Sequence, residues 1–382
     1  MTTRKIASHF LLTPNGILSN AIVSLSSKGI ITNIESQERL DSVAGLEFYS
    51  GILLPCLVNS HCHLELSYLK GQITPQCGFA GFAKQLSECR DKFSSDTVQR
   101  AMDFWDAKMW AEGIGLVGDV CNSRSSLNLK SRSRIDYFDF AEVYGLNSGV
   151  DAVLPLLEAH KDFKLECNLS PHSCYSLNTK TFRDIIARCD RAKPISVHFM
   201  ETQSERELFE QKGELWHWYS ERGFSVDFLG DISPVDRIIK NIPPEQKILL
   251  VHNTVLAKKD AERLISHFGD NLSWVLCPKS NKYISGQTPD IKMLMNLGAR
   301  ILIGTDSLSS NTELSLCEEL KCFADDISLL DLIAMVTTNA TSAFSREDLN
   351  LKVGNKAQLV LLKGADLANN KLLSGSTFER IL

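Results

Sequence analysis

Residues 53–67 read LLPCLVNSHCHLELS, an apolar run that leads directly into two closely spaced histidines. A short, continuous apolar run is typical of a strand that is buried on both faces, as in a parallel sheet. Side chains two positions apart on a strand lie on the same face, so His61 and His63 reach toward one point. Two adjacent buried imidazoles need partners for their ring nitrogens. This stretch therefore predicts a buried strand that ends in a functional site.

Short apolar runs of the same kind alternate with helix-like segments along most of the chain. The expected strands are 52–60, 115–121, 134–143, 163–170, 194–200, 247–253, 272–278 and 299–307. The helix-like segments include 96–112, 151–160, 179–192, 204–222, 257–268 and 288–298. Eight strands that alternate with helices over roughly 300 residues predict an α/β chain with a closed (β/α)₈ TIM-like barrel. The alternative is an open doubly wound sheet, but no glycine-rich dinucleotide fingerprint follows the first strand.

The two ends of the chain have a different pattern, which is typical of antiparallel strands. Residues 1–51 contain alternating segments separated by turn signals, and the tail 351–367 again resembles hairpin sequence. We therefore expect a small β-sandwich domain built from both ends, 1–51 and 346–382. The barrel would then occupy 52–345.

The composition is that of an ordinary globular protein. The chain has 382 residues, of which 43% are hydrophobic and 23% are charged, and its net charge is −5 without a basic block. A nucleic-acid surface is therefore not expected. No apolar stretch approaches the roughly 20 residues of a membrane span, and the N-terminus lacks the apolar core of a signal peptide. The 11 cysteines include no CxxC pair, so we expect reduced thiols and a cytoplasmic location.

Residues that are able to bind metal or move protons follow several of the expected strands. They are His61, His63, His172, His198, Glu201, His252 and Asp306, and they include five of the nine histidines. In a (β/α)₈ barrel the carboxyl ends of the strands meet at one mouth, where active sites lie. Taken singly, such residues have ordinary roles: Asp306 could cap a helix, and Glu201 could be a solvated carboxylate in a first helical turn. Their joint placement predicts one shared site.

The donor types in this set favour a single divalent metal ion. Three imidazoles and one carboxylate suit Zn²⁺ most simply, with an open position for water, and Fe or Mn are alternatives. Such an ion lowers the pKa of a bound water to about 7. A second ion would need a bridging lysine or acid from the fourth strand, but Lys164 lies at the start of that strand, roughly eight residues from the mouth. We therefore expect one metal ion.

Six segments, in order along nearly the whole chain, carry a resemblance to a known family. They are LLPCLVNSHCHLELS at 53–67, LSPHSCYS at 169–176, ISVHFMETQSERE at 195–207, ILLVHNTVL at 248–256, VLCPKSN at 275–281 and GTDSLSSN at 304–311. With these motifs the chain resembles the amidohydrolase superfamily. The similarity is greatest to the branch of cytosine, guanine and adenosine-type deaminases and the related chlorohydrolases.

The resemblance implies roles for individual residues. The metal ligands would be His61, His63, His198 and Asp306. Glu201 matches the proton-shuttling glutamate, and His252 matches a histidine that holds the attacking water or the developing negative charge. Asp306 would also take the proton of the attacking water.

The resemblance is weaker where substrate would be recognised. His172 resembles a histidine that contacts substrate, and Asn281 resembles the asparagine of the CPxSN motif, with a loop or cap role equally open. The loop after His63 lacks the Trp-Leu and Pro-x-Glu pattern of many nucleoside deaminases and looks more like members that act on aminodeoxyfutalosine, an adenine-bearing compound. Glu65 in this loop would contact substrate or support the site from behind. The family's C-terminal G-x-x-A-D motif is GNKAQ at 354–358, a departure in the small β domain.

The expected function is metal-dependent hydrolytic deamination of an amino-substituted N-heterocycle, such as a purine base or an adenine-bearing nucleoside-like compound. One alternative is hydrolysis of a cyclic amide or of a C–Cl bond at the same site. Others are a catalytically inactive metal-binding protein on this scaffold, and metal storage or sensing. The presence of all four ligands together with Glu201 argues against inactivity, and storage would not require Glu201. A small-molecule substrate is the expected partner, and a homodimer is left open.

Overall fold

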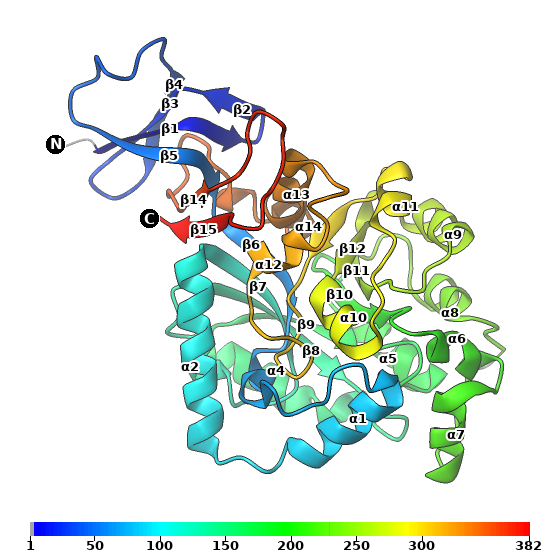
Figure 1. Ribbon diagram of the computed structural model, residues 1–382. Helices are drawn as coiled ribbons and strands as arrows, with labels where there is room; N and C mark the ends of the chain where they lie inside the picture. Colours follow the sequence, from blue (N-terminus) through cyan, green and yellow to red (C-terminus); the bar gives the residue numbers. More distant parts are fainter. Residues whose placement is uncertain (1–3, 229) are drawn as a thin grey trace. The chain divides into compact units, whose positions relative to one another are not determined.

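The computed structural model describes residues 4–228 and 230–382 and has an α/β architecture (Figure 1). The described chain divides into two compact units. The first is formed by Ser60–Asp106 and Val117–Leu314, and the second by the N-terminal residues up to Asn59, Ala107–Leu116 and Ser315–Leu382. The predicted division into one domain from 1–51 with 346–382 and another from 52–345 stays a prediction.

Two four-stranded sheets position the candidate site residues. Their strand orders are β6-β7-β8-β9 and β10-β11-β12-β13. The bounds are β6 Leu57–Cys62, β7 Ile114–Cys121, β8 Asp136–Val143, β9 Glu166–Pro171, β10 Ile195–Phe199, β11 Ile248–His252, β12 Leu272–Leu276 and β13 Ile301–Ile303. The pairs β8–β9, β10–β11, β11–β12 and β12–β13 are parallel. The prediction of an α/β chain with parallel strands is confirmed.

Isolated parallel bridges join the outer strands of these two sheets. One bridge pairs Cys62 in β6 with Asp306, which follows β13, and the other pairs Ser173, which follows β9, with His198 in β10. The amide N–H of Asp306 also donates to the carbonyl oxygen of His61 at 3.0 Å. Residues at the carboxyl ends of these strands are therefore neighbours although they lie far apart in the sequence.

The burial of the strands explains the continuous apolar runs. Every residue of β6, β7, β10, β11, β12 and β13 is buried. A strand that is covered on both faces has no solvent side on which polar residues could alternate. Polar side chains such as His198 and His252 therefore stand out at the ends of these strands.

Helices follow most of the parallel strands (Figure 1). They are α1 Gly78–Cys89, α2 Ser95–Glu112, α3 Leu127–Lys130, α4 Leu154–Phe163, α5 Thr179–Arg188, α6 Gln203–Phe209, α7 Gly213–Glu221, α8 Pro234–Asn241, α9 Lys258–Phe268, α10 Pro278–Ser285, α11 Ile291–Asn296, α12 Leu316–Lys321, α13 Leu329–Val336 and α14 Thr338–Ala343. Within the described chain, none combines the length and hydrophobicity needed to cross a membrane. The predicted helix 204–222 is two helices, α6 and α7. They separate at Gly213, whose φ of 82° is a left-handed conformation that favours glycine.

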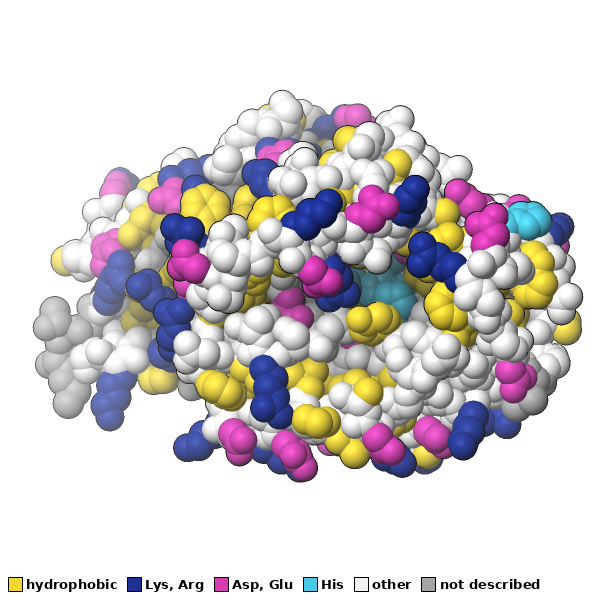
Figure 2. Space-filling view, turned by 90° about the horizontal axis from the view of Figure 1, so that it is seen from below, with side chains coloured by type: hydrophobic (Ala, Val, Ile, Leu, Met, Phe, Trp, Pro, Cys, Tyr) yellow, Lys and Arg dark blue, Asp and Glu magenta, His cyan; other side chains and the backbone are white. Residues whose placement is uncertain are grey.

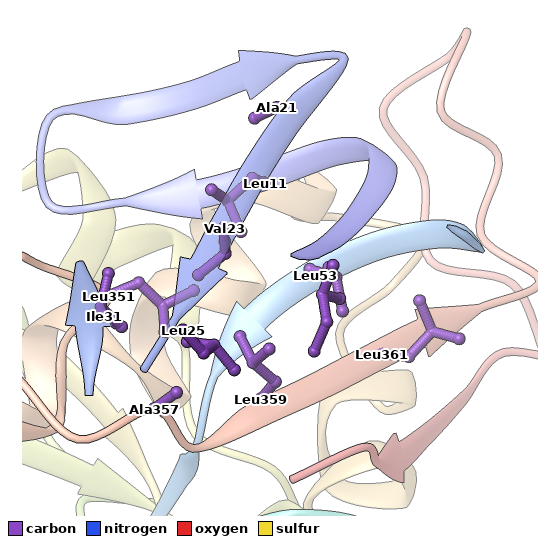
Figure 3. Packing of buried hydrophobic residues seen from close by; sticks show 11 residues of the cluster. Leu11, Ala21, Val23, Leu25, Ile31, Leu53, Leu351, Ala357, Leu359 and Leu361 are labelled. Atoms are coloured by element: carbon purple, nitrogen blue, oxygen red, sulfur yellow. The ribbon is translucent and has the colours of Figure 1, made fainter. Parts of the chain in front are cut away.

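Strands from both ends of the chain form one seven-stranded sheet. Its order is β15-β14-β5-β1-β3-β4, and β2 pairs with β1. The bounds are β1 Arg4–Thr13, β2 Gly16–Ser19, β3 Ala21–Leu25, β4 Ile31–Ser36, β5 Leu46–Pro55, β14 Leu359–Lys363 and β15 Thr377–Arg380. Figure 3 shows the buried apolar side chains of this sheet, among them Leu11, Val23, Leu53 and Leu359. Burial of these residues ties the two ends of the chain into one hydrophobic core.

The predicted strand 52–60 belongs to two strands. Residues up to Pro55 form the end of β5 and pair with β1 and β14, whereas Leu57 begins β6. Proline has no backbone N–H, so Pro55 can end the pairing on one side of β5. A continuous apolar run does not reveal such a change of sheet, because both strands are buried.

Candidate active site

The four predicted metal ligands converge. Nε2 of His63 lies 3.2 Å from Nε2 of His61 and 3.2 Å from Nε2 of His198. Oδ1 of Asp306 lies 3.5 Å from Nε2 of His63 and 3.6 Å from Nε2 of His61. All four residues are buried, and they come from β6, β10 and the end of β13. The structure thus brings together side chains that are up to 245 positions apart, counted from His61 to Asp306.

These four donors fit a divalent metal ion. A tetrahedral Zn²⁺ with ligand distances of about 2.0–2.1 Å separates its nitrogen ligands by about 3.3 Å. Nδ1 of His198 donates to the carbonyl oxygen of His172 at 2.9 Å, which leaves the lone pair on Nε2 facing the other donors. Burial lowers the pKa of His63 to about 4 and that of His198 well below its usual value, so both rings are neutral at pH 7. Lone pairs that face one another repel, and a cation among them removes this repulsion.

Two serines orient the carboxylate of Asp306. Oδ2 accepts hydrogen bonds from the hydroxyl groups of Ser280 at 2.5 Å and Ser310 at 3.0 Å. Burial would raise the pKa of Asp306, but the hydrogen bond from His61 and the neighbouring imidazoles hold it well below the usual value. Asp306 is therefore ionised, and Oδ1 is left to face His61 and His63.

The backbone turns sharply where the site residues leave their strands. Met200, His252 and Asp306 have φ values of 50°, 80° and 56°, in the left-handed region that residues other than glycine rarely adopt. Such strain is often stored at functional sites, where the surrounding structure holds it. Gly304 allows a close approach here, because a Cβ at this position would lie 2.6 Å from Cβ of His61.

Glu201 lies next to the four donors as a buried carboxyl group. It is 7% exposed, and Oε1 lies 3.9 Å from Nε2 of His252. Burial raises the pKa of Glu201 well above its usual value, and the charge of Asp306 adds to the shift. The raised pKa favours the protonated carboxyl group, which can donate a proton.

His252 is held by Asn281. Nδ2 of Asn281 lies 3.2 Å from Nδ1 of His252. With the amide donating, Nδ1 accepts and Nε2 carries the proton of the ring. Burial lowers the pKa of His252 to about 3, so the ring is neutral. Asn281 is 1% exposed and lies against His252, and its predicted contact with substrate stays a prediction.

Glu142 is a site residue that sequence reasoning missed. Oε1 of Glu142 lies 2.7 Å from Nδ1 of His172, and Oε2 accepts from Nδ2 of Asn122 at 2.8 Å. Burial opposes ionisation, but the charge and hydrogen bond of His172 lower the pKa of Glu142 to about 2. The ionised carboxylate fixes Nδ1–H of His172 toward itself. The signal in the sequence was the position of Glu142 at the end of a predicted strand, 134–143.

Glu65 supports a loop of the site. Its carboxylate accepts the backbone N–H of Asn122 at 3.3 Å and of Ser123 at 3.2 Å, and the hydroxyl group of Ser126 at 3.2 Å. Of the two predicted roles, these contacts match support from behind. Asn122 in turn holds Glu142, so the loop after β7 and the end of β8 are connected.

Buried charges below these loops were not predicted. Nζ of Lys130 lies 2.6 Å from Oδ2 of Asp119 and 2.7 Å from Oδ1 of Asp139, and Nε2 of His160 lies 2.7 Å from the other oxygen of Asp139. Burial would lower the pKa of Lys130, but the two aspartates raise it well above its usual value. Oδ1 of Asp119 accepts the backbone N–H of Leu64 at 2.8 Å. We call Lys130, Asp119, Asp139 and His160 the Lys130 cluster. Through Asp119 this cluster holds Leu64, the residue that follows His63.

A cavity of about 690 Å³ opens onto the site, and Figure 2 shows histidine side chains inside a hollow of the molecular face. Its lining includes His63, His172, His198, Glu201, His252 and Asp306. Other parts of the lining come from α1 and from α7 with the residues that follow it, and are mostly apolar or aromatic, including Phe79, Phe82, Leu86, Leu215, Trp218 and Phe224. Arg90 adds a cation at the end of the 64–90 loop. The cavity therefore joins a polar reaction centre to a largely apolar wall.

The sequence profile of the amidohydrolase family matches residues 52–380. The chain belongs to the amidohydrolase family. This match confirms the predicted resemblance of the sequence to amidohydrolases. The expected class of enzyme, a hydrolase of carbon–nitrogen bonds other than peptide bonds, is confirmed by the family match together with relatives that are named deaminases.

Comparisons with individual proteins agree with this assignment. The adenosine deaminase of Helicobacter pylori is 26% identical to this amidohydrolase over 339 residues, which are 84% of this chain and 79% of that protein. The crystal structure of Helicobacter pylori aminofutalosine deaminase in complex with methylthio-coformycin has a TM-score of 0.78 at 22% identity, covering 95% of this chain and 93% of the other. Atrazine chlorohydrolase TrzN from Arthrobacter aurescens TC1, complexed with zinc, has a TM-score of 0.75 at 17% identity, covering 95% and 88%. The two structural likenesses show a shared fold.

Proposed function

We propose that this amidohydrolase is a metal-dependent hydrolytic deaminase that releases ammonia from an adenine-type substrate. The main support is the buried carboxyl group of Glu201, whose pKa is raised, beside a four-donor metal site and within a cavity large enough for a nucleoside-like compound. The relative that is named adenosine deaminase supports the same assignment. A purine base or an adenine-bearing compound such as aminodeoxyfutalosine matches this chemistry.

We propose that the sheets β6–β9 and β10–β13 close into one (β/α)₈ barrel. Support comes from the bridges that link Cys62 with Asp306 and Ser173 with His198, because they make the outer strands of the two sheets neighbours. In such a barrel the carboxyl ends of all strands face one mouth. The seven-stranded sheet of the chain ends would be the small β-sandwich domain.

The metal would be one Zn²⁺ ion, with Fe or Mn as alternatives. Its ligands would be His61, His63, His198 and Asp306. When bound, the ion would activate a water molecule for attack by lowering the pKa of that water. A single ion is supported by the position of Lys164, which ends α4 as its C-cap instead of joining the donors.

Glu201 would supply the proton that starts the reaction. An aromatic carbon that bears an amino group resists attack until a neighbouring ring nitrogen is protonated, because the ring must accept electrons. Glu201 donates this proton from its carboxyl group, and after ionisation it takes up the second proton of the attacking water and passes it to the leaving amine. The first water proton, accepted by Asp306, then restores Glu201. Water and the amine thus become a carbonyl group and ammonia.

Asp306 and His252 would manage the attacking oxygen. Oδ1 of Asp306 accepts a proton of the water, because Oδ2 is already held by Ser280 and Ser310. Nε2–H of His252 donates to the oxygen as negative charge develops on it, and Asn281 keeps that proton on Nε2.

The half of the substrate that does not react would be recognised by His172 and by the loop 64–90. His172 lines the cavity and is fixed by Glu142. The loop includes α1, whose Phe79, Phe82 and Leu86 line the same cavity. Their apolar surface matches an apolar or aromatic substituent on the adenine-bearing compound.

Hydrolysis of a C–Cl bond is the second candidate. It is favoured by the shared fold with atrazine chlorohydrolase, and it would use the same four donors. The two reactions release different products, chloride and ammonia. Ammonia and chloride release, screened over adenine-, guanine- and cytosine-bearing compounds and chlorinated triazines, distinguishes them, and a ring-opened acid would indicate a cyclic amide.

We further propose a cytoplasmic location, which the free thiols of all eleven cysteines support. The homodimer stays a prediction.

The Glu201→Gln variant tests the proposed function. Glutamine keeps the size of the side chain and removes the proton, so kcat for ammonia release should fall about 10²–10⁴-fold while the metal stays bound. Glu210→Gln, at the exposed C-terminal end of the helix α6 that follows Glu201, is the matched control and should keep wild-type turnover. A metal-containing Glu201→Gln protein with near wild-type kcat would remove Glu201 from the mechanism, and the deaminase assignment would lose its main support.

A further inference from the structure

Glu205, in the first turn of α6, is a buried carboxyl group whose burial no ion pair explains. It is 1% exposed, and its Oε2 accepts the backbone N–H of Glu201 at 3.2 Å. Oε1 is buried and has no hydrogen-bond partner among the residues that the structure describes. A buried polar atom without a partner opposes folding, so this arrangement does not exist for stability alone.

The local sequence Thr202-Gln-Ser-Glu205 has the pattern of a helix capping box. In a capping box the glutamate at the third helical position bonds the N–H of the N-cap residue, which here is Thr202. Glu205 instead reaches one residue further back, to Glu201. Glu205 thus accepts a hydrogen bond from Glu201, which precedes the helix and is the proposed proton donor.

The connection between β10 and α6 gives this hydrogen bond its importance. Met200 has a φ of 50°, a strained conformation for a side chain of its size, and Glu201 follows it directly. The peptide unit between them decides where the carboxyl group of Glu201 points. The N–H of Glu201 belongs to this peptide unit, so its hydrogen bond to Glu205 holds the turn.

We propose that Glu205 is a positioning residue that fixes the turn at Met200 and Glu201 and so aims the carboxyl group of Glu201 at the substrate. The inference rests on the proposed deamination, in which Glu201 transfers the proton. Without Glu205 the turn can relax toward an unstrained conformation, and Glu201 moves relative to His252, 3.9 Å away. A displacement of about 1 Å in a reacting group can lower the rate by about 10²-fold.

The protonation of Glu205 agrees with this role. Burial raises the pKa of Glu205 to about 8, although the hydrogen bond from the N–H of Glu201 acts in the opposite direction. A neutral Glu205 accepts this N–H without placing a negative charge beside Glu201. Glutamine has the same shape and an amide oxygen that accepts the same N–H, so it is the conservative replacement.

The test compares Glu205→Leu with Glu205→Gln and with the control Glu210→Leu, the same substitution at the exposed end of α6. In Glu205→Leu, kcat for ammonia release should fall between about 10- and 100-fold, while KM and metal content stay within about twofold. Glu205→Gln should restore kcat to within a few-fold of wild type.

Wild-type kcat in Glu205→Leu would overturn the inference, as would a lowered kcat that Glu205→Gln does not restore. Amide hydrogen exchange of the segment 199–208 gives a second measurement that needs no substrate. Exchange should be faster in Glu205→Leu than in wild type and unchanged in Glu205→Gln, and equal rates in all three proteins would overturn the inference. If the wild-type protein released no ammonia, the proposed function would fail, and the exchange rates would still decide whether Glu205 holds the turn.

Discussion

Replacement of Lys130 by methionine should destabilise the protein by an amount that depends on pH. Nζ of Lys130 lies between Asp119 and Asp139, and none of the three side chains is exposed to solvent. Nδ1 of His160 faces the carbonyl oxygen of Leu156, which only accepts, and Nε2 faces Asp139 at 2.7 Å. One proton is therefore shared between His160 and Asp139, and that pair has no net charge. Lys130 and Asp119 also sum to zero, so the wild-type Lys130 cluster is neutral.

The variant is left with one excess negative charge in a buried place. The protein can remove this charge by protonating one aspartate, at a free-energy cost set by the difference between the pH and the ordinary aspartate pKa of 3.8. At 1.36 kcal/mol for each unit, this cost is about 4.4 kcal/mol at pH 7 and about 1.6 kcal/mol at pH 5. Burial already raises the pKa of Asp119 to about 6 in the wild type, so the wild type carries part of the same cost below pH 6. The loss of unfolding free energy relative to wild type should therefore be larger at pH 7 than at pH 5, by less than the full difference of about 2.8 kcal/mol. The cost at pH 7 lies within the range of about 3–5 kcal/mol that is typical for breaking a buried ion pair.

Urea unfolding followed by tryptophan fluorescence at pH 5 and pH 7 measures this loss. The matched control is the double variant Lys130→Met with Asp119→Asn, in which the asparagine oxygen still accepts the N–H of Leu64 and the excess charge is gone. The double variant should regain most of the loss at pH 7. A loss below about 1 kcal/mol at pH 7 for Lys130→Met, or an equal loss at both pH values, would refute the charge count.

The remaining predictions concern the site. Protein purified without added metal should contain about one divalent ion for each chain, and His61→Ala should remove it; two ions in the wild-type protein would contradict the single site. His172→Ala should raise KM much more than it lowers metal content, because His172 is placed to contact substrate; equal metal loss would instead make it a ligand. Glu205→Gln should be more stable than wild type, and the difference in unfolding free energy should grow between pH 4.5 and pH 8. The folded wild type keeps the proton of Glu205 up to a pKa of about 8, whereas the unfolded chain loses it near pH 4.5, so the wild type becomes less stable over this range. The difference should rise by about 1.4 kcal/mol for each pH unit, to at most about 5 kcal/mol, and a difference that does not change with pH would contradict the burial of this carboxyl group.

Features that depend on local periodicity could be predicted from the sequence. The i and i+2 spacing of His61 and His63 placed both imidazoles on one face of β6, and their Nε2 atoms lie 3.2 Å apart. Continuous apolar runs predicted the parallel strands, because these strands are buried on both faces. The same run at 52–60 hid the change from β5 to β6, since burial is equally complete on both sides of Cys56.

Features that depend on partners from different elements could not be predicted. Lys130 in α3 is buried because Asp119 in β7 and Asp139 in β8 face it, and no spacing in the sequence reveals that meeting. The resemblance of the CPxSN motif placed Asn281 at the substrate, which stays a prediction, and the contact between Asn281 in α10 and His252 in β11 was not predicted. Helix periodicity likewise continued from α6 into α7, but α6 ends at Phe209, and the left-handed backbone at Gln211 and Gly213 separates the two helices.

The metal ligands and the apolar lining of the cavity belong to parts of the protein that differ in burial. His61, His63 and His198 lie on or directly after strands whose residues are all buried, and Asp119 holds the backbone beyond His63. Helix α1 has no completely buried residue, although its apolar side chains line the cavity. Segments with few buried contacts open locally at low free-energy cost. An apolar substrate group would cover α1 and supply the contacts that the helix lacks, so substitutions in α1 can change substrate choice while the strands that carry the metal ligands stay intact.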